Sequence, residues 1–536
     1  MTSKYILPPL PDITLTELLL SRVKAHGDRP ALIDGPSGRT IKFDELEPMI
    51  RKCAAGLAAR GLGKGDVIGL LSPNSIDYPI ALFGAATVGA TVTTLNPLYT
   101  PFEISRQLKD ANARQLYVSG PLLEKAYEAV ALGADLTRVY SFDELPVLPP
   151  EGPPLEAFSA LLESQDAPPA VGIEPSTDVV FIPYSSGTSG MPKGVELTHR
   201  NLVANVLQAM VASGLGPDDT VVGVLPFYHI YGFTVILNVA LCAGSTIVTM
   251  PSFEPVLFLK ILKEHDITVA HVAPPLVGFL ARHPAVEAVL PLPRLAELFS
   301  GAAPLGKELE DAARQRLGCV VRQGYGMTEA SPVTHIMPMS LAQAGVAQGA
   351  VGELVPGMEC KLIDLNGAPV GVGERGEICL RGPNIMKGYL NRPEANAESF
   401  DADGFYKTGD VGFVDEDGLY YVVDRVKELI KVKGFQVPPA ELEDVLLGSE
   451  AIADAAVIGV ACAKHGEVPK AFVVRQSGHE SVSALDISSF LVGKVAEYKL
   501  ISAENVEFVQ AVPKSAAGKI LRKELRALEA SSRARS

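Results

Sequence analysis

The sequence predicts an α/β protein: a large N-terminal domain of stacked α/β sheets with a β-barrel-like subdomain, and a small α+β C-terminal domain. Its 536 residues are enough for two to four domains. Apolar residues make up 47% of the chain and charged residues 20%, which is typical of globular proteins. Short apolar runs alternate with helical patterns, as expected for buried sheets covered by helices. Disordered, collagen-like and coiled-coil chains are therefore excluded.

Apolar runs of strand length recur through the first half of the chain and predict buried strands. They lie at 67–71, 91–96, 115–120, 179–186, 246–250 and 267–274. Helical patterns fit between them, at 78–89 after a polar loop and at 201–211 after the capping signal at 198–200. The Pro-rich stretch 146–175 predicts a surface excursion.

The pattern changes after about residue 350, where short runs broken by Gly and Asp predict β-hairpins as far as residue 423. From residue 425 a new α+β pattern begins. Its predicted elements are a helix at 439–448, strands at 455–461 and 470–475, and a helix at 487–495. We therefore expect a domain boundary near Asp424.

Charge and hydropathy limit the partners of the protein. The chain has 47 basic and 62 acidic residues, a net charge of −15, so a nucleic-acid-binding surface is not expected. Its six cysteines form no CxxC pair, which favours a reducing compartment over a disulfide framework or a zinc ribbon. The N-terminus lacks the apolar core of a signal peptide. The longest apolar tract, 233–248, is interrupted by Asn238 and Gly244 and is shorter than the roughly 20 residues of a membrane span. We expect a cytoplasmic protein; nothing in the sequence indicates its oligomeric state.

The strongest local motif is Tyr184-Ser-Ser-Gly-Thr-Ser-Gly-Met-Pro-Lys-Gly194, directly after an apolar strand. Small and hydroxylic residues allow backbone N–H groups and hydroxyls to converge on phosphate oxygens, and Lys193 adds a positive charge. The segment is not a Walker A loop, because Pro192 precedes the lysine and no Ser or Thr follows it. It predicts a polyphosphate-binding loop, although a flexible glycine-rich turn has the same composition.

Four further motifs are weak individually. Gly324–Glu329 has Glu329 where a dinucleotide fingerprint has its third glycine, but Thr328 and Glu329 offer oxygen ligands for Mg²⁺. Tyr406–Asp410 places a carboxylate at a hairpin turn, suited to two ribose hydroxyls, yet turn aspartates are usually structural. Asp424–Gly434 contains a concentration of basic residues, and such a run usually forms a solvent-exposed face. Pro513–Arg522 presents Lys519 on a loop, where lysines are usually just solvated.

Taken in order, these motifs resemble the adenylate-forming superfamily of acyl-CoA synthetases, luciferases and adenylation domains, most closely its 4-coumarate–CoA ligase branch. The segments 300–312, 323–333, 376–390 and 424–437 also match, and the resemblance runs from about residue 15 to 525. It implies an enzyme that joins a carboxylic acid to Mg-ATP as an acyl-adenylate, releases pyrophosphate and passes the acyl group to CoA. A carboxylate and a triphosphate repel each other, so such a site needs cations and N–H donors.

The resemblance implies roles for residues across the chain. It assigns phosphate binding to Ser185, Ser186, Gly187, Thr188, Ser189 and Lys193, and the α-phosphate and Mg²⁺ to Thr328 and Glu329. It assigns the adenine wall to Ala302, Ala303, Pro304, Gln323, Gly324 and Tyr325, and the ribose to Asp410 and Arg425. Lys519 matches the catalytic lysine that bridges the substrate carboxylate and the α-phosphate.

For the second half-reaction the family rotates its small C-terminal domain. The resemblance therefore implies a hinge at 424–427 between an adenylation domain, 1–423, and a mobile domain, 428–536. Lys427, Lys431 and Gln436 resemble residues that then contact the adenylate, Lys433 and Gly434 those that meet CoA, and His229 the gate for the thiol. Ser252 stands where this branch often has a basic residue, so one contact to a CoA phosphate is not expected.

The acyl pocket implied by the resemblance is apolar with a single phenol. It comprises Ile230, Tyr231, Val235, Phe299, Ala302, Gly326, Pro332 and Val333. Such a wall suits a hydroxycinnamate whose para-hydroxyl meets Tyr231. A medium- or long-chain fatty acid also fits chemically, and a luciferase-like relative is a further alternative. A carrier-loading or non-catalytic adenylate-binding module is disfavoured by the presence of Lys519, Lys431 and Glu329.

Overall fold

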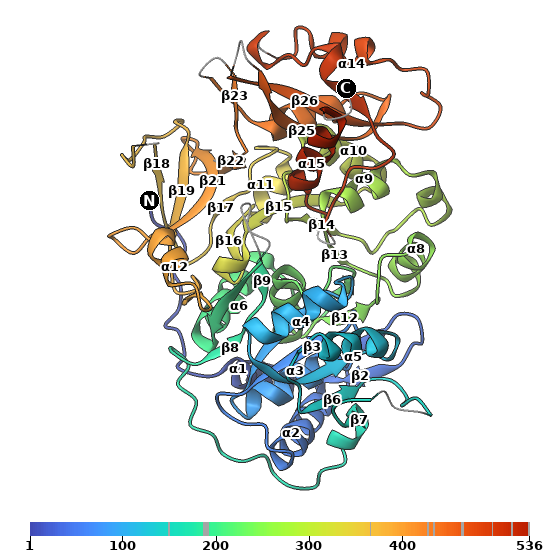
Figure 1. Ribbon diagram of the computed structural model, residues 1–536, viewed down its shortest axis with the longest axis vertical. Helices are drawn as coiled ribbons and strands as arrows, with labels where there is room; N and C mark the ends of the chain where they lie inside the picture. Colours follow the sequence, from blue (N-terminus) through green and yellow to red (C-terminus); the bar gives the residue numbers. More distant parts are fainter. Residues whose placement is uncertain are drawn as a thin grey trace.

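The computed structural model describes residues 1–147, 151–185, 192–364, 366–425, 428–432, 435–462, 466–495, 497–515 and 518–533. It confirms the predicted fold class, a large N-terminal α/β portion followed by a small C-terminal one. Figure 1 shows the C-terminal portion, in red, lying across one end of the larger portion. No helix within the described ranges is both long and apolar enough to cross a bilayer.

Two large sheets form the centre of the N-terminal portion. The first has the strand order β17-β16-β15-β14-β13-β11-β12-β1-β2 and the second β20-β10-β8-β4-β3-β5-β6-β7, with β9 paired to β10. The strands of the first are β1 (Pro30–Asp34), β2 (Thr40–Lys42), β11 (Thr220–Gly223), β12 (Thr246–Thr249), β13 (Val269–Val272), β14 (Glu297–Ser300), β15 (Val320–Gly326), β16 (Val333–Ile336) and β17 (Glu353–Leu354). Those of the second are β3 (Val67–Leu71), β4 (Thr91–Leu95), β5 (Ala113–Val118), β6 (Arg138–Ser141), β7 (Leu155–Ala157), β8 (Val179–Phe181), β9 (Tyr184–Ser185), β10 (Lys193–Thr198) and β20 (Gly388–Tyr389).

Helices cover the faces of these sheets, as the largely parallel pairing of their central strands requires. They are α1 (Leu15–Val23), α2 (Phe43–Ala59), α3 (Tyr78–Thr87), α4 (Pro101–Asp110), α5 (Leu123–Ala131), α6 (His199–Ser213), α7 (Ala240–Ala243), α8 (Pro255–Glu264), α9 (Pro274–Arg282), α10 (Lys307–Leu317), α11 (Met339–Ala344) and α12 (Pro393–Ser399). The Thr198 side chain accepts a hydrogen bond from the Asn201 N–H, so α6 begins at this cap, slightly earlier than predicted.

Two smaller sheets complete the fold. The predicted hairpins form a sheet of order β18-β19-β21-β22, with β18 (Glu359–Ile363), β19 (Gly376–Arg381), β21 (Tyr406–Val414) and β22 (Tyr420–Arg425). The C-terminal sheet has the order β24-β23-β26-β25, with β27 paired to β26; its strands are β23 (Ile430–Val432), β24 (Phe435–Val437), β25 (Ile452–Cys462), β26 (Gly466–Arg475) and β27 (Val506–Phe508). Its helices are α13 (Pro439–Leu447), α14 (Ala484–Leu491) and α15 (Arg522–Arg533).

Two segments differ from the expectation of simple strands, helices and surface loops. The apolar tract after residue 232 begins as a π-helix, Gly232–Val239, and all of its residues are buried. Within the Pro-rich excursion, Phe158 and Leu161 are buried in the main core, so the excursion is anchored by two apolar side chains.

The C-terminal portion contacts the N-terminal portion around α9 and α10. The Arg282 guanidinium donates to the Leu447 carbonyl at 3.3 Å, which joins α9 to the end of α13. A Cβ on Gly306 would lie 1.5 Å from an Asp444 carboxylate oxygen, so α10 and α13 meet closely here and a larger residue would displace that carboxylate. A Cβ on Gly518 would lie 3.2 Å from Ala273, at the start of α9. This last contact brings the loop that carries Lys519 to the carboxyl end of β13.

Candidate active site

The candidate site lies at the carboxyl ends of β13, β14 and β15, where ligands usually bind in open α/β sheets. The chain leaves β14 into the loop of Ala302, Ala303 and Pro304, and Ala302 has a left-handed φ of 74°. Ala302 and Pro304 are exposed, so this loop presents apolar surface to the site. The Gln323 amide instead donates to the Leu305 carbonyl and the Glu310 carboxylate, so Gln323 braces the expected adenine wall from behind.

The residues expected at the ribose come together from three strands. The Tyr325 hydroxyl on β15 donates to Asp410 Oδ2 on β21 at 2.6 Å. Arg425 Nε on β22 lies 3.1 Å from Asp410 Oδ1. Burial and the neighbouring Asp410 raise the pKa of Tyr325 well above its usual value, so its phenol stays protonated. Asp410 is thereby held as an oriented hydrogen-bond acceptor.

A second polar network lies around Glu329. Tyr389 donates to Glu329 Oε1 at 2.9 Å and lies 3.2 Å from the Tyr406 hydroxyl. The Lys193 ammonium lies 4.2 Å from the centre of the Tyr389 ring, a cation–π contact. The network therefore connects the lysine of the expected phosphate loop to the expected Mg²⁺ ligands.

The rest of the expected phosphate loop is only partly described. Ser185 Oγ is buried and has no hydrogen-bond partner among the described residues. Ser186, Gly187, Thr188 and Ser189 lie outside the described residues.

The side-chain oxygens of Thr328 and Glu329 are suitable ligands for a magnesium ion that is bound together with a polyphosphate. Mg²⁺ usually binds through one or two carboxylates, with phosphate oxygens and water completing its shell. Glu329 supplies such a carboxylate, and no cluster of three or more His, Cys, Asp or Glu suited to a metal occurs in the described part of the chain. A metal here would therefore share its ligands with the nucleotide.

Lys519 reaches this site from the C-terminal portion. Its pKa is lowered to about 8, first by burial and then by the positive charge of Arg425. The carboxylates of Asp410, Glu428 and Glu329 act in the opposite direction. All four groups are therefore close enough to interact with one ammonium, which lies among the expected ribose and Mg²⁺ residues.

His229 lies near Lys519. Its Nδ1 accepts a hydrogen bond from the Tyr231 N–H at 3.4 Å. Burial and the neighbouring Lys519 ammonium lower its pKa to about 4. His229 is therefore a neutral imidazole at physiological pH, next to the amine of Lys519.

The expected acyl-pocket residues surround Tyr231. Ile230, Val235, Phe299 and Val333 are buried, and the Tyr231 hydroxyl donates to the Phe299 carbonyl at 3.1 Å. A phenol that already donates can still accept a hydrogen bond, so Tyr231 can receive one from a substrate hydroxyl.

Three glycines keep this pocket narrow. A Cβ on Gly301 would lie 2.9 Å from the Tyr231 ring, and one on Gly324 would lie 2.8 Å from the Phe299 ring. A Cβ on Gly326 would lie 2.2 Å from the Pro332 carbonyl oxygen. Larger residues at these positions would displace the pocket walls.

One polar residue beside the pocket was missed by the sequence analysis. His271 on β13 is fully buried, with its ring 5.4 Å from that of Phe299 and 6.2 Å from that of Tyr231. Neither ring nitrogen has a partner among the described residues, and burial with the Arg322 charge lowers its pKa to about 3. A single histidine inside an otherwise apolar buried strand was the signal that could have indicated it.

Most of the residues expected to contact the adenylate or CoA from the C-terminal portion in the second half-reaction lie outside the described part of the chain. Lys427, Lys433 and Gly434 lie outside the described residues, as does the side chain of Gln436 on β24. Lys431 is exposed on β23, and its N–H donates to Glu467. Ser252 is exposed in the loop after β12.

A cavity of about 550 Å³ lies at the opposite, amino ends of β13, β14 and β15. Its acidic residues are already satisfied: Glu297 pairs with Arg322, Glu353 with Lys4, and Asp219 accepts from Thr268. It therefore lacks the convergent unpaired groups of the candidate site.

Comparison with known proteins agrees with this geometry. Residues 19–390 match the family model of the AMP-binding enzyme, and residues 441–519 match the model of the AMP-binding enzyme C-terminal domain. The chain belongs to the AMP-binding enzyme family. Its sequence is 43% identical to a 4-coumarate–CoA ligase of Pinus taeda, over 96% of each chain.

Solved structures resemble this AMP-binding enzyme over nearly its whole length. The anthranilate CoA ligase AuaEII in complex with anthranoyl-AMP has a TM-score of 0.88 and 26% identity, covering 98% of this chain and 99% of the other. ATP-bound MatB from Rhodopseudomonas palustris has a TM-score of 0.82 and 28% identity, covering 96% and 99%. The chain thus belongs to the family of AMP-forming acid–CoA ligases.

Proposed function

We propose that this enzyme converts 4-coumarate or a related hydroxycinnamate to its CoA thioester through an acyl-adenylate, releasing AMP and pyrophosphate. The observation that carries the proposal is the packing of Gly518 against Ala273, which brings the Lys519 loop to the carboxyl end of β13. The charges of Arg425, Asp410 and Glu329 also act on the pKa of Lys519. The anthranoyl-AMP and ATP bound in two similar structures support the same chemistry.

In this proposal, adenylation depends on placing one positive charge between two anions. Asp410, held by Tyr325 and Arg425, would accept the ribose hydroxyls. The Lys519 ammonium would lie between the substrate carboxylate and the α-phosphate, where negative charge accumulates in the transition state. Lys193, with residues of the phosphate loop, would hold the outgoing pyrophosphate, and Mg²⁺ at Thr328 and Glu329 would neutralise phosphate charge when bound.

The second half-reaction would need Lys519 to leave, because the CoA thiol must reach the adenylate carbonyl. Asp424, the first residue of the proposed hinge, accepts from the N–H groups of Arg425 and Ala440. It therefore connects the last strand of the larger portion to the start of α13. Rotation about 424–427 would present Lys431 in place of Lys519, with the neutral His229 as the gate for the thiol.

The walls of the pocket favour a hydroxylated aromatic acid over a fatty acid. Tyr231 can accept a hydrogen bond, and the unpartnered imidazole of His271 lies behind Phe299. An aliphatic chain would leave both groups without new partners, whereas a ring hydroxyl could donate to Tyr231.

The substrate proposal can be tested by incubating the enzyme with Mg-ATP, CoA and a panel of cinnamates and fatty acids. We expect AMP and pyrophosphate as products, with kcat/KM for 4-coumarate exceeding that for saturated fatty acids by at least about 100-fold. Formation of ADP would refute the adenylate route, and preference for a fatty acid would refute the hydroxycinnamate assignment.

A matched pair of substrates tests Tyr231 itself. Tyr231→Phe should lower kcat/KM for 4-coumarate by about tenfold, because the ring hydroxyl loses its acceptor. Cinnamate, which has no hydroxyl, should be nearly unaffected by the same substitution. An equal loss for both acids would show that Tyr231 only shapes the pocket.

The pKa of Lys519 predicts a pH dependence that is specific to adenylation. Because its pKa lies near 8, the ammonium loses its proton as the pH rises through 8, and kcat/KM for adenylate formation should fall there. In Lys519→Arg the guanidinium stays charged, so a slower reaction without this alkaline decline is expected. ATP–pyrophosphate exchange, followed between about pH 6 and about pH 10, measures the pH profile of the wild type and of Lys519→Arg. The same decline in Lys519→Arg would assign it to another group.

A further inference from the structure

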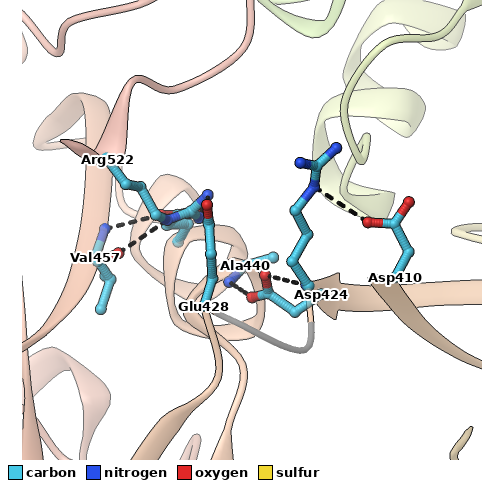
Figure 2. Close-up of polar contacts among 8 residues, drawn as sticks. Asp410, Asp424, Glu428, Ala440, Val457 and Arg522 are labelled. Atoms are coloured by element: carbon cyan, nitrogen blue, oxygen red, sulfur yellow. Dashed lines mark hydrogen bonds and ion pairs between the residues drawn. The ribbon is translucent and has the colours of Figure 1, made fainter. Parts of the chain in front are cut away.

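Arg522, the first residue of α15, lies three positions after Lys519 and makes an unusually complete set of contacts. Its side chain is only 11% exposed. One terminal nitrogen donates to Glu428 at 2.7 Å, the other to both oxygens of Glu443 at 2.7 Å, and Nε donates to the Val457 carbonyl at 3.2 Å. Figure 2 shows Arg522 extending from α15 toward Glu428 and Val457.

The contact with Glu428 connects Arg522 to the expected ribose-binding residues. The N–H of Glu428 donates to the Arg425 carbonyl at 2.9 Å. The Arg425 side chain in turn pairs with Asp410. A continuous path of hydrogen bonds and ion pairs therefore runs from the helix that follows Lys519 to the carboxylate expected to hold the nucleotide.

The contact with Glu443 anchors the same guanidinium in the C-terminal core. Glu443, on α13, also accepts from the Val457 N–H at 2.8 Å, so α13, β25 and α15 meet at one ion pair. Burial raises the pKa of Glu443 to about 7, with the charge of Arg522 opposing that rise and Asp424 adding to it. Without the guanidinium, the carboxylates of Glu428, Glu443 and Asp424 would face one another in a buried space.

The loop that carries Lys519 is closed by its own backbone, and Lys514 near its start pairs with Asp454 on β25 at 2.6 Å. The Ser515 N–H donates to the Lys519 carbonyl, and the Leu521 N–H donates to the Pro513 carbonyl. These bonds define the shape of the loop, and the Lys514 pair joins its first part to β25. Arg522, directly after the loop, is the side chain whose contacts relate it to both α13 and Glu428.

We propose that Arg522 is a positioning residue for adenylation: its contacts with Glu428 and Glu443 set where the Lys519 ammonium lies relative to Arg425 and Asp410. The inference rests on the proposed function. Displacement of a catalytic group by about 1 Å can lower the rate about 100-fold. A loosened loop should therefore slow the step that uses Lys519. The thioester step does not use Lys519 and should be spared.

The test compares the two half-reactions in Arg522→Ala and Arg522→Lys. ATP–pyrophosphate exchange with 4-coumarate should fall by about 100-fold in Arg522→Ala. It should fall by about tenfold in Arg522→Lys, which keeps the charge but cannot reach three acceptors at once. Conversion of supplied 4-coumaroyl-AMP to the thioester should stay within about twofold of the wild type. Arg526→Ala, one turn further along α15 and exposed, is the matched control and should leave both steps unchanged.

The outcomes separate positioning from a general structural role. Equal losses in both half-reactions, or full exchange activity in Arg522→Lys, would overturn the proposal. If Arg522→Ala does not fold, Glu428→Gln tests the same path, because it removes one acceptor and leaves the Glu443 pair; an exchange rate equal to that of the wild type would again overturn it. A wild-type enzyme that shows no exchange with any acid would instead refute the proposed function.

Discussion

Lys519→Ala should reduce the rate of adenylate formation by about 100- to 1000-fold. The ammonium is the positive charge that the C-terminal portion brings to the residues around Asp410, and removing one such group from a preorganised site costs about 3–4 kcal/mol. ATP–pyrophosphate exchange measures this step directly. Thioester formation from supplied 4-coumaroyl-AMP should continue, because in the proposed mechanism that step follows the departure of Lys519.

The neighbouring lysine provides the control for this experiment. Lys523 is exposed at the start of α15, so Lys523→Ala removes the same charge from the same helix without reaching the site. It should leave both half-reactions close to those of the wild type. Equal damage to both steps by Lys519→Ala would contradict the proposed division of work between two arrangements of the C-terminal portion.

Arg322→Met should lower the free energy of unfolding by about 3–5 kcal/mol, the largest stability effect that we expect. Arg322 is 1% exposed and pairs with Glu297 at 2.6 Å, and it also donates to the carbonyls of Ala212 and Ser213 at the end of α6. Its loss leaves the Glu297 carboxylate buried without a counter-charge. Urea unfolding followed by circular dichroism measures the change.

The pH dependence of this loss tests its cause. Burial already raises the pKa of Glu297, and without Arg322 it should rise further. The folded variant then binds a proton that the unfolded chain releases near the ordinary glutamate pKa, so its stability should fall as the pH rises from about 5 to about 8.

A double variant supplies the matched control. Arg322→Met/Glu297→Leu removes both charges and should recover much of the stability with little of this pH dependence. If Arg322→Met loses the same free energy of unfolding at about pH 5 and at about pH 8, packing rather than charge is responsible.

Much of the fold was accessible from local pattern. The strands at 67–71 and 91–96 form as β3 and β4, and the cap at Thr198 starts α6, because alternation, apolar runs and capping depend on nearby residues. The π-helix of Gly232–Val239 was not accessible, since a continuous apolar run has no period that separates buried helix types from strands. The burial of Phe158 and Leu161 depended on a core built by distant segments.

The candidate site divides in the same way. Motifs indicated Lys193, Glu329, Asp410 and Lys519 as residues able to carry chemistry, but each motif had a structural alternative. His271 lay within a predicted strand and Arg522 at the end of the motif that presents Lys519, but neither pattern assigned a role to these two side chains. The partners of Arg522 lie in a boundary segment and a predicted helix, and nothing in the sequence related these to one another.

The sequence by itself determined the family, the α/β class and the identities of the residues that can bind a nucleotide and an acid. Only the tertiary structure decided which of them meet. Tyr325 and Asp410 are 85 positions apart, and Arg522 and Glu428 are 94 apart, yet each pair shares a hydrogen bond. The reason is physical: local backbone preferences act over a few residues, whereas these contacts depend on the path of the whole chain and on burial that concentrates charge at the junction of its two portions.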